Sequence, residues 1–256
     1  MSRGITVVKV GGNEVDDAAW LARFAASLVL RGGSTVVVHG GGKEITTLQR
    51  ALGAEPEWRD GLRVTTEASM RAVAMVLSGV VNKRVVSALL SAGTDAIGVS
   101  GEDGGLLRAE VLRGGELGRT GEVAQVRTRL LLAWLEQGLL PVVSPVSRGP
   151  DGGPLNVNAD DAAAAVAAAL GATELLLVSN VPGVLRGGEV VRSVAADGVE
   201  ALVEDGTASA GMAPKLRAAA RAAAAGARVR IGGLEMLRDA GAGTRVLRAR
   251  ALAGTA

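Results

Sequence analysis

Two lysines occupy positions where a cationic side chain is unexpected. Lys9 lies within the apolar run Ile5–Val10 (ITVVKV), and a strand buried on both faces would strip its ammonium of several kcal/mol of hydration unless a partner replaced the water. We expect Lys9 at the strand tip, reaching a phosphate, although a lysine extending to solvent from a sheet margin has the same pattern. Lys215 follows Pro214 at the start of an Ala-rich segment, where a cation opposes the helix dipole. It is either a surface lysine or a second cation directed at the same anion.

Glycines follow two of the predicted strands. Gly11 and Gly12 come after Ile5–Val10, and Gly40–Gly42 come after Thr35–Val38. Ligands of open α/β sheets lie beyond the carboxyl ends of the strands, where backbone N–H groups without neighbouring side chains approach an anion closely. One such pair would indicate a tight turn, whereas two clusters at neighbouring strand ends favour a phosphate site. The P-loop pattern GxxxxGK[ST] and the dinucleotide-binding pattern GxGxxG are both absent, so the sequence fits neither of these two common phosphate-binding motifs.

Polar residues gather before the helix predicted at 160–171. The segment 155–161 reads LNVNADD, and ordinary helix capping explains only one or two of its polar side chains. The alternation of Asn156, Asn158 and Asp160 places two amides and a carboxylate on one side of an extended approach. Arg63, in DGLRVT, is suited to bidentate capture of a carboxylate, and a solvated loop arginine is the alternative.

This set of residues favours phosphoryl transfer. Two lysines, one carboxylate, one arginine and glycine-rich backbone supply positioning and charge neutralisation, which carry most of that chemistry. The chain has no cysteine and a single histidine, His39, which excludes thiolate and multi-histidine metal sites. With only one Phe, three Trp and no Tyr, base stacking is disfavoured, and we expect no nucleic acid partner.

Hydrophobic periodicity predicts the elements that must position these residues. We predict strands at 5–10, 35–38, 96–100, 140–144, 174–179, 228–231 and 244–248. We predict helices at 14–30, 43–52, 67–92, 128–138, 160–171, 195–205 and 213–225. Residues 56–65 are expected as a loop, and residues 102–127 as hairpins or short antiparallel strands.

The alternation of strands and helices predicts an α/β fold, a three-layer αβα sandwich around a mainly parallel central sheet. Within this one continuous domain of 256 residues we expect an N-terminal lobe, 1–150, and a C-terminal lobe, 151–256. The net charge is only +2, so the pI near 9.5 reflects the scarcity of groups that titrate near neutral pH. We expect a cytoplasmic protein with no membrane partner.

The motifs together resemble the amino acid kinase family from end to end. They are VKVGG at 8–12, VHGGGKEI at 38–45, DGLRVT at 60–65, GVVNKRVV at 79–86, GVSGEDG at 98–104, LPVVSPV at 140–146, LNVNADDAA at 155–163, SNVPGV at 179–184 and GMAPK at 211–215. DGLRVT, NVNAD and GMxxK point to the members that act on N-acetyl-L-glutamate. The resemblance implies a carbamate kinase-like fold and ATP-dependent phosphorylation of the γ-carboxylate to N-acetyl-L-glutamyl 5-phosphate, a step of arginine biosynthesis.

The resemblance also implies a role for each matching position. Lys9 and Lys215 would stabilise the transferring phosphoryl group, with Asp160 holding both lysines. Gly41, Gly42, Arg63 and Asn156 would bind acetylglutamate, and the first lobe would also form the dimer. The positions that would surround phosphates and nucleotide are Gly11, Gly12, Asn180, Gly183, Leu185, Ser209, Gly211 and Met212. Mg²⁺ would be held mainly by the nucleotide phosphates, with no protein metal site.

Two other functions stay open at this point. One is phosphorylation of carrier-protein-bound aminoadipate in lysine biosynthesis, and the other is a non-catalytic amino-acid sensor on the same fold. GLRVT and NVNAD argue against the first, and the joint presence of Lys9, Asp160 and Lys215 argues against the second. Asn180 departs from the pattern, since many relatives carry Asp there, and an amide cannot hold a cation by charge.

The segment Glu67–Ala92 is apolar on more than one helical face, so several faces must be covered. Burial within one subunit is one explanation, and the resemblance implies the other, a two-fold dimer interface. Relatives inhibited by arginine carry an additional helix before the first strand, for which Met1–Gly4 leave no room. We therefore expect a homodimer whose activity is unchanged by arginine.

Overall fold

The computed structural model describes residues 4–208 and 211–249, and its centre is an eight-stranded sheet. The order across the sheet is β14 (Ser193–Ala195), β16 (Thr244–Leu247), β15 (Arg228–Gly232), β11 (Glu174–Val178), β1 (Thr6–Val10), β2 (Thr35–His39), β8 (Leu140–Ser144) and β5 (Ala96–Ser100). All neighbours in this order are parallel except β15 and β16. All seven predicted strands lie in this sheet, and its eighth strand, β14, was not expected.

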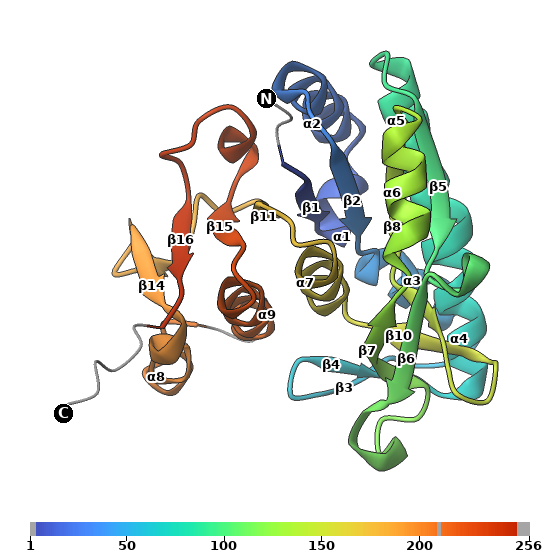
Figure 1. Ribbon diagram of the computed structural model, residues 1–256. Helices are drawn as coiled ribbons and strands as arrows, with labels where there is room; N and C mark the ends of the chain where they lie inside the picture. The colour runs from blue at the N-terminus through green and yellow to red at the C-terminus, as the bar shows by residue number, and fades with distance from the viewer. Residues whose placement is uncertain (1–3, 209–210, 250–256) are drawn as a thin grey trace, which may run out of the picture.

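Helices cover both faces of this sheet, as Figure 1 shows. Alternate residues of each strand point to opposite faces, so Val7 packs with α6 (Thr128–Glu136), α7 (Ala159–Ala169) and α9 (Met212–Ala224). Val8, the next residue, packs on the opposite face. That face carries α2 (Ala18–Arg31), α3 (Gly42–Ala51), α4 (Glu67–Ala74) and α5 (Asn82–Ser91). The predicted three-layer sandwich is confirmed.

The predicted helix at 14–30 is divided in two. A single turn, α1 (Gly12–Val15), precedes α2, and Asp17 separates them because its carboxylate accepts the backbone N–H of Trp20 at 3.0 Å as an N-cap. The predicted helix at 195–205 is a short 3₁₀ turn followed by α8 (Val199–Glu204). Apolar spacing did not reveal these interruptions because it continues across them.

The segment 56–65, expected as a loop, is a β-hairpin of β3 (Glu57–Arg59) and β4 (Leu62–Val64). Residues 102–127 contain the expected antiparallel pair, β6 (Leu107–Val111) and β7 (Thr120–Val126). With β9 (Val146–Arg148) and β10 (Pro154–Val157) this pair closes into a small barrel, which lies beside the hairpin in Figure 1. A further two-stranded ribbon joins β12 (Leu185–Arg186) to β13 (Glu189–Val190).

The predicted long helix is continuous from Glu67 to Ser91, but its middle, Met75–Val81, is π-helical. By length and composition alone it could cross a membrane. Its Val73, Leu77, Val81 and Val85 are instead 0 to 2% exposed in the core beneath the sheet. We therefore assign it as a core helix of the fold.

The central sheet extends across the boundary expected near residue 150. β1, β2, β5 and β8 precede that residue, and β11, β14, β15 and β16 follow it. Because β1 pairs directly with β11, side chains from both lobes meet where these two strands end.

Candidate active site

A buried triad of two lysines and one aspartate lies where β1 ends and where α7 and α9 begin. Lys9, near the end of β1, shares the face of Val7 and therefore points toward α7 and α9. Its Nζ lies 3.0 Å from Asp160 Oδ1, and Lys215 Nζ lies 2.9 Å from the same oxygen. All three residues are 7% exposed. The structure thus resolves both sequence alternatives in favour of lysines that converge.

The triad carries a net charge of +1. Burial by itself would raise the pKa of Asp160, but the charges of Lys9 and Lys215 outweigh it and lower the pKa to about 2. Burial, and then the charge of Lys9, lower the pKa of Lys215 to about 8. One carboxylate therefore neutralises only one of two neighbouring ammonium groups, and the remaining charge attracts an anion such as a phosphate.

The helix starts next to this triad bring glycine backbones together. Asn158 caps α7, accepting the backbone N–H groups of Asp160 and Asp161 at 2.8 and 3.3 Å, and so fixes the first turn that carries Asp160. Gly12 opens α1 and Gly41 caps α3. A Cβ on Gly12 would lie 2.7 Å from the backbone nitrogens of both Gly41 and Gly42. Only glycine permits this approach of two helix N-termini, where backbone donors face one small volume.

An ion-pair network ties these helices together. Arg84 of α5 contacts Asp16 at 3.1 Å and Glu44 of α3 at 2.6 Å. Glu14, in the single turn α1, is 8% exposed and accepts the backbone N–H of Asn180 at 3.0 Å. Sequence patterns gave no signal for the Glu14 contact, since it joins residues far apart in the chain.

Arg63 is not a solvated loop residue but a buried one, 5% exposed, on β4. Its guanidinium donates to Gln49 Oε1 at 2.8 Å, Thr46 Oγ1 at 2.8 Å and the Gly42 carbonyl at 3.0 Å. The indole of Trp58 stacks over it, 4.4 Å from the ring centroid. All these partners are neutral, and no ion pair found within residues 4–208 and 211–249 includes Arg63. Burial lowers the pKa of Arg63, yet the group remains charged at neutral pH.

Two threonines fix the backbone of Arg63. Thr120 Oγ1 donates to the Arg63 carbonyl at 2.6 Å, and Thr65 Oγ1 contacts the same carbonyl at 3.2 Å while it accepts from the side-chain amide of Asn156 at 3.0 Å. Thr120 and Thr65 also bond each other at 3.2 Å. Of these contributors, Trp58, Thr120, Gln49 and Thr46 were missed from sequence, because only the fold places them around the arginine.

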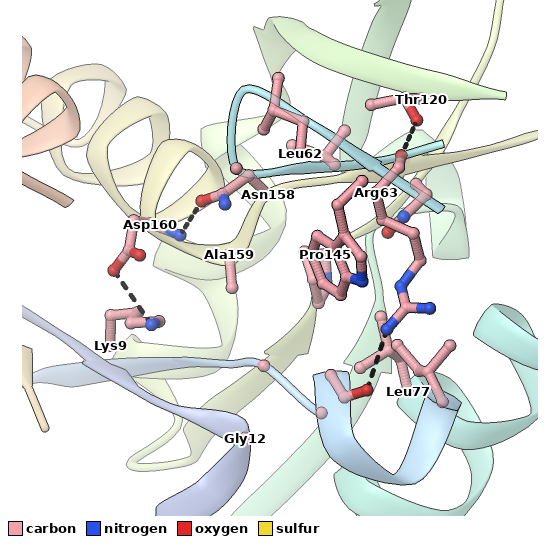
Figure 2. Close-up of a pocket in the computed structure, with 18 residues that line it drawn as sticks. Lys9, Gly12, Leu62, Arg63, Leu77, Thr120, Pro145, Asn158, Ala159 and Asp160 are labelled. Atoms are coloured by element: carbon pink, nitrogen blue, oxygen red, sulfur yellow. Dashed lines mark hydrogen bonds and ion pairs between the residues drawn. The ribbon is translucent and has the colours of Figure 1, made fainter. Parts of the chain in front are cut away.

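These groups line one cleft, which encloses about 200 Å³ and is drawn in Figure 2. Lys9 and Asp160 lie on one side of it and Arg63 on the other, with Gly12 beneath. Gly41, Gly42 and Asn156 also line it, as do the apolar side chains of Ile45, Trp58, Leu62 and Leu77. A ligand that fills the cleft therefore meets cationic groups at both ends and apolar walls between them.

Of the expected phosphate and nucleotide residues, Gly12 lines this cleft, and the others that the structure describes lie outside its lining. Gly11 caps α1. Gly211 caps α9 and Met212 begins it, three residues before Lys215. Asn180 follows β11 and lines a separate hollow beside Trp20 of α2. Gly183 packs against Thr244 and Val190, while Leu185 is 39% exposed on β12. Ser209 lies outside the described residues.

No group of three or more His, Cys, Asp or Glu side chains is placed to hold a metal ion among the described residues. The carboxylate of Asp160 is already shared by two lysines. A divalent cation at this cleft would therefore depend on oxygen ligands from a bound molecule, as Mg²⁺ at phosphates commonly does.

The fold and the triad define a class of protein. The amino acid kinase family matches residues 4–233, and the chain belongs to this family. Among solved structures, a carbamate kinase from Giardia has the same fold, with a TM-score of 0.68 and 17% identity over 96% of this chain and 99% of that one.

The relatives with the more similar sequences are acetylglutamate kinases. The acetylglutamate kinase of Roseiflexus sp. strain RS-1 is 48% identical over 242 residues, which cover 93% of this chain and 92% of the relative. That of Chloroflexus aurantiacus strain J-10-fl is 49% identical over 241 residues, covering 93% and 95%. The crystal structure of smu.665 from Streptococcus mutans UA159 superimposes with a TM-score of 0.82 at 29% identity, covering 95% of this chain and 98% of that one.

Proposed function

We propose that this chain transfers the γ-phosphoryl group of ATP to the γ-carboxylate of N-acetyl-L-glutamate, as an enzyme of arginine biosynthesis. One observation carries the proposal beyond family membership. The buried Arg63 has only neutral partners and lines the same cleft as Lys9 and Asp160, the residue that Lys215 also contacts. A buried charge without a counter-ion is costly, so the cleft is completed by an anionic ligand. A dicarboxylate meets that need at Arg63 and carries a second carboxylate toward the triad.

The residues present account for the reaction. Arg63 would hold the α-carboxylate, with Asn156 and the Gly41–Gly42 backbone positioning the rest of the acceptor. An oxygen of the γ-carboxylate then forms a bond to the γ-phosphorus while the bond from that phosphorus to the bridging oxygen of ADP breaks. Lys9, Lys215 and the glycine N–H groups stabilise the charge on the transferring group, and Asp160 keeps the two ammonium groups together.

ATP would reach the triad from the loops around Asn180 and the N-terminus of α9. Support comes from the position of Gly211 and Met212 one turn before Lys215, which brings helix N–H groups and the lysine to the same region. Mg²⁺ would be held mainly by the phosphates, where it would neutralise charge on ATP. Because Asn180 contributes its backbone to Glu14, we expect its amide to be less important for the nucleotide than its backbone position.

Trapping of the acyl phosphate with hydroxylamine tests this function directly. Purified protein is incubated with ATP, Mg²⁺ and, in separate reactions, N-acetyl-L-glutamate, glutamate, aspartate or carrier-bound aminoadipate. We expect ATP-dependent hydroxamate with N-acetyl-L-glutamate. If hydroxamate formed only with carrier-bound aminoadipate, the enzyme would belong to lysine biosynthesis. If no acceptor were phosphorylated but an amino acid bound tightly, the protein would be a sensor.

We also propose that the enzyme works in the cytoplasm, where its substrates would be available.

We further propose a homodimer formed through the helix Glu67–Ser91. The inner side of this helix lies in the core, but Met75, Val80 and Leu90 are 59%, 51% and 51% exposed. Large apolar groups at these exposures support an additional contact, and a second copy of the chain is the partner we propose.

A further inference from the structure

A buried polar network lies at the end of β2, behind the glycine turn. Its centre is His39, the single histidine of the chain, and Asn82, the first residue of α5; both are 0% exposed. Asn82 Nδ2 lies 3.1 Å from His39 Nε2, and His39 Nδ1 lies 3.1 Å from the Gly40 carbonyl. Neither side chain lines the cleft.

The surrounding groups fix the orientation of the Asn82 amide. Its Nδ2 faces the carbonyls of Val142 at 3.0 Å and Val99 at 3.3 Å, which only accept hydrogen bonds. Its Oδ1 accepts from Lys83 Nζ at 3.1 Å, which only donates. Asn82 therefore presents an N–H group to His39.

That orientation determines the tautomer of the imidazole. A proton on Nε2 would face the NH₂ group of Asn82, donor against donor, so Nε2 carries the lone pair and the proton resides on Nδ1, which donates to the Gly40 carbonyl. Burial lowers the pKa of His39 to about 4, so the ring remains neutral at physiological pH. The neutral imidazole thus connects Asn82 to the Gly40 carbonyl, with one ring nitrogen as acceptor and the other as donor.

The Gly40–Gly42 turn is restrained from three directions. The Gly40 carbonyl accepts from His39, and the Gly40 N–H donates to Val10 of β1 at 3.0 Å. Leu77 of the π-helical segment packs so closely on Gly41 that a Cβ there would lie 2.7 Å from its Cδ2. Asn82 follows that segment directly, so one helix supplies both the packing and the hydrogen-bonded support.

We propose that His39 and Asn82 are positioning residues, which aim the backbone of Gly41 and Gly42 at the reacting groups through the Gly40 carbonyl. The inference rests on the proposed function, because the turn matters for catalysis only if phosphoryl transfer takes place there. Displacing reacting groups by about 1 Å costs roughly 10²-fold in rate, so a loose turn would lower kcat.

Three variants and one control test this. His39→Leu removes the donor to Gly40, His39→Asn retains an amide donor near the position of Nδ1, and Asn82→Ala removes the support of the ring. Val85→Ala is the control, because Val85 is 0% exposed on the same helix and its side chain cannot take part in the hydrogen bonds of this network. We expect about 10- to 100-fold lower kcat for His39→Leu with little change in the KM for ATP. His39→Asn should recover most of the loss, and Val85→Ala should lower stability without lowering kcat.

Imidazole ¹⁵N spectra supply a readout that does not depend on activity, since one histidine gives one set of signals. We expect a protonated Nδ1 and a bare Nε2 in the wild type, and faster amide hydrogen exchange at Gly41 in His39→Leu. Any of three results would overturn the proposal. They are a protonated Nε2, a wild-type kcat in His39→Leu, and kcat losses that follow the free energy of unfolding in all four variants. If the wild type phosphorylates no acceptor, the proposed function fails, while the spectra and exchange still decide the positioning.

Discussion

At the scale of residues, the cleft is organised by an excess of buried positive charge. Lys9, Lys215 and Arg63 contribute three positive charges to its surroundings, against one negative charge from Asp160. Burial makes each of these charges costly on its own. Asp160 offsets the charges of Lys9 and Lys215 but has no contact with Arg63, so the binding of anionic ligands would stabilise the site further.

The first prediction concerns the two lysines. Lys9→Ala and Lys215→Ala should each lower kcat by roughly 10²–10³-fold, because both charges act mainly on the transition state. KM for either substrate should change far less. Steady-state kinetics decide this, and a change confined to KM in both variants would contradict the assigned role.

The pKa of Lys215 gives the second prediction. In the free enzyme it is about 8, so the ammonium is present below pH 8 and is lost above it. We expect kcat/KM to fall above about pH 8, as Lys215 loses its proton. In the enzyme–substrate complex the bound phosphates favour the charged ammonium, so the fall of kcat should begin at a higher pH. Asp160→Asn removes the counter-charge and should move the limb to lower pH. A flat kcat/KM profile from pH 7 to about 10 would speak against a titrating Lys215.

Arg63 provides the third prediction. Arg63→Lys keeps a charge but loses the planar fork, so the KM for N-acetyl-L-glutamate should rise strongly while the KM for ATP changes little. The matched variant is Arg59→Lys, on the same hairpin but 55% exposed in its side chain, which should leave both constants unchanged. Equal effects of Arg63→Lys on both substrates would mean that it serves something other than the acceptor.

Lys9, Lys215 and Asp160 could be found from the sequence because each stands in a pattern that ordinary strand or helix rules do not explain. A lysine in a buried strand and surplus polar groups before a helix are visible without a structure. The state of Arg63 was not visible, since its burial depends on Gln49, Thr46 and Trp58, which surround it only after folding. For the same reason, the support of Gly40 by Asn82 through His39 left no signal in local spacing.

At the scale of elements, the glycine turns at the ends of β1 and β2 are the tightest part of the site. The predicted strands placed them correctly, because buried parallel strands read as continuous apolar runs. The β3–β4 hairpin was not predicted because its strands are only three residues each and Glu57–Arg59 is exposed. The signal that could have revealed it is Asp60-Gly61, a typical two-residue hairpin turn, in which both residues have positive φ. The helix at 14–30 was predicted as one piece because a cap such as Asp17 does not interrupt hydrophobic spacing.

A fourth prediction tests the contact between those turns. Gly12→Ala would place a methyl group 2.7 Å from two backbone nitrogens, which cannot move without displacing the start of α3. We expect a lower melting temperature and a kcat loss of about 10²-fold, as for reacting groups displaced by roughly 1 Å. In Gly42→Ala the added methyl meets nothing within 4 Å, so the melting temperature should be retained. Equal melting temperatures for the two variants would contradict the close approach.

At the scale of the whole molecule, one sheet contains strands from both sides of residue 150. The long helix Glu67–Ser91 packs on the glycine turn with its inner side, and its outer side is exposed. If this helix forms the dimer, assembly and catalysis share one element. Sequence alone could not separate burial in the core from burial in an interface, because both require apolar residues.

The fifth prediction therefore concerns assembly. Light scattering should give a mass of about twice 25.7 kDa for the wild type. Val80→Glu, on the exposed side of the helix, should give monomers, because a charge would be buried in the interface. Leu52→Glu is the control, since Leu52 is 62% exposed but lies at the end of α3. A dimer that survives Val80→Glu would place the contact elsewhere.

The stack of Trp58 on Arg63 makes the cleft optically observable. The chain has no tyrosine, so its intrinsic fluorescence comes from three tryptophans, and one of them touches the cation that would receive the acceptor. Replacing Trp20, which stacks on Phe24, and Trp134 by Phe would leave a single emitter at the cleft. Its emission would then follow a carboxylate as it approaches Arg63, in real time and without a coupled assay, so the binding of the acceptor could be timed directly.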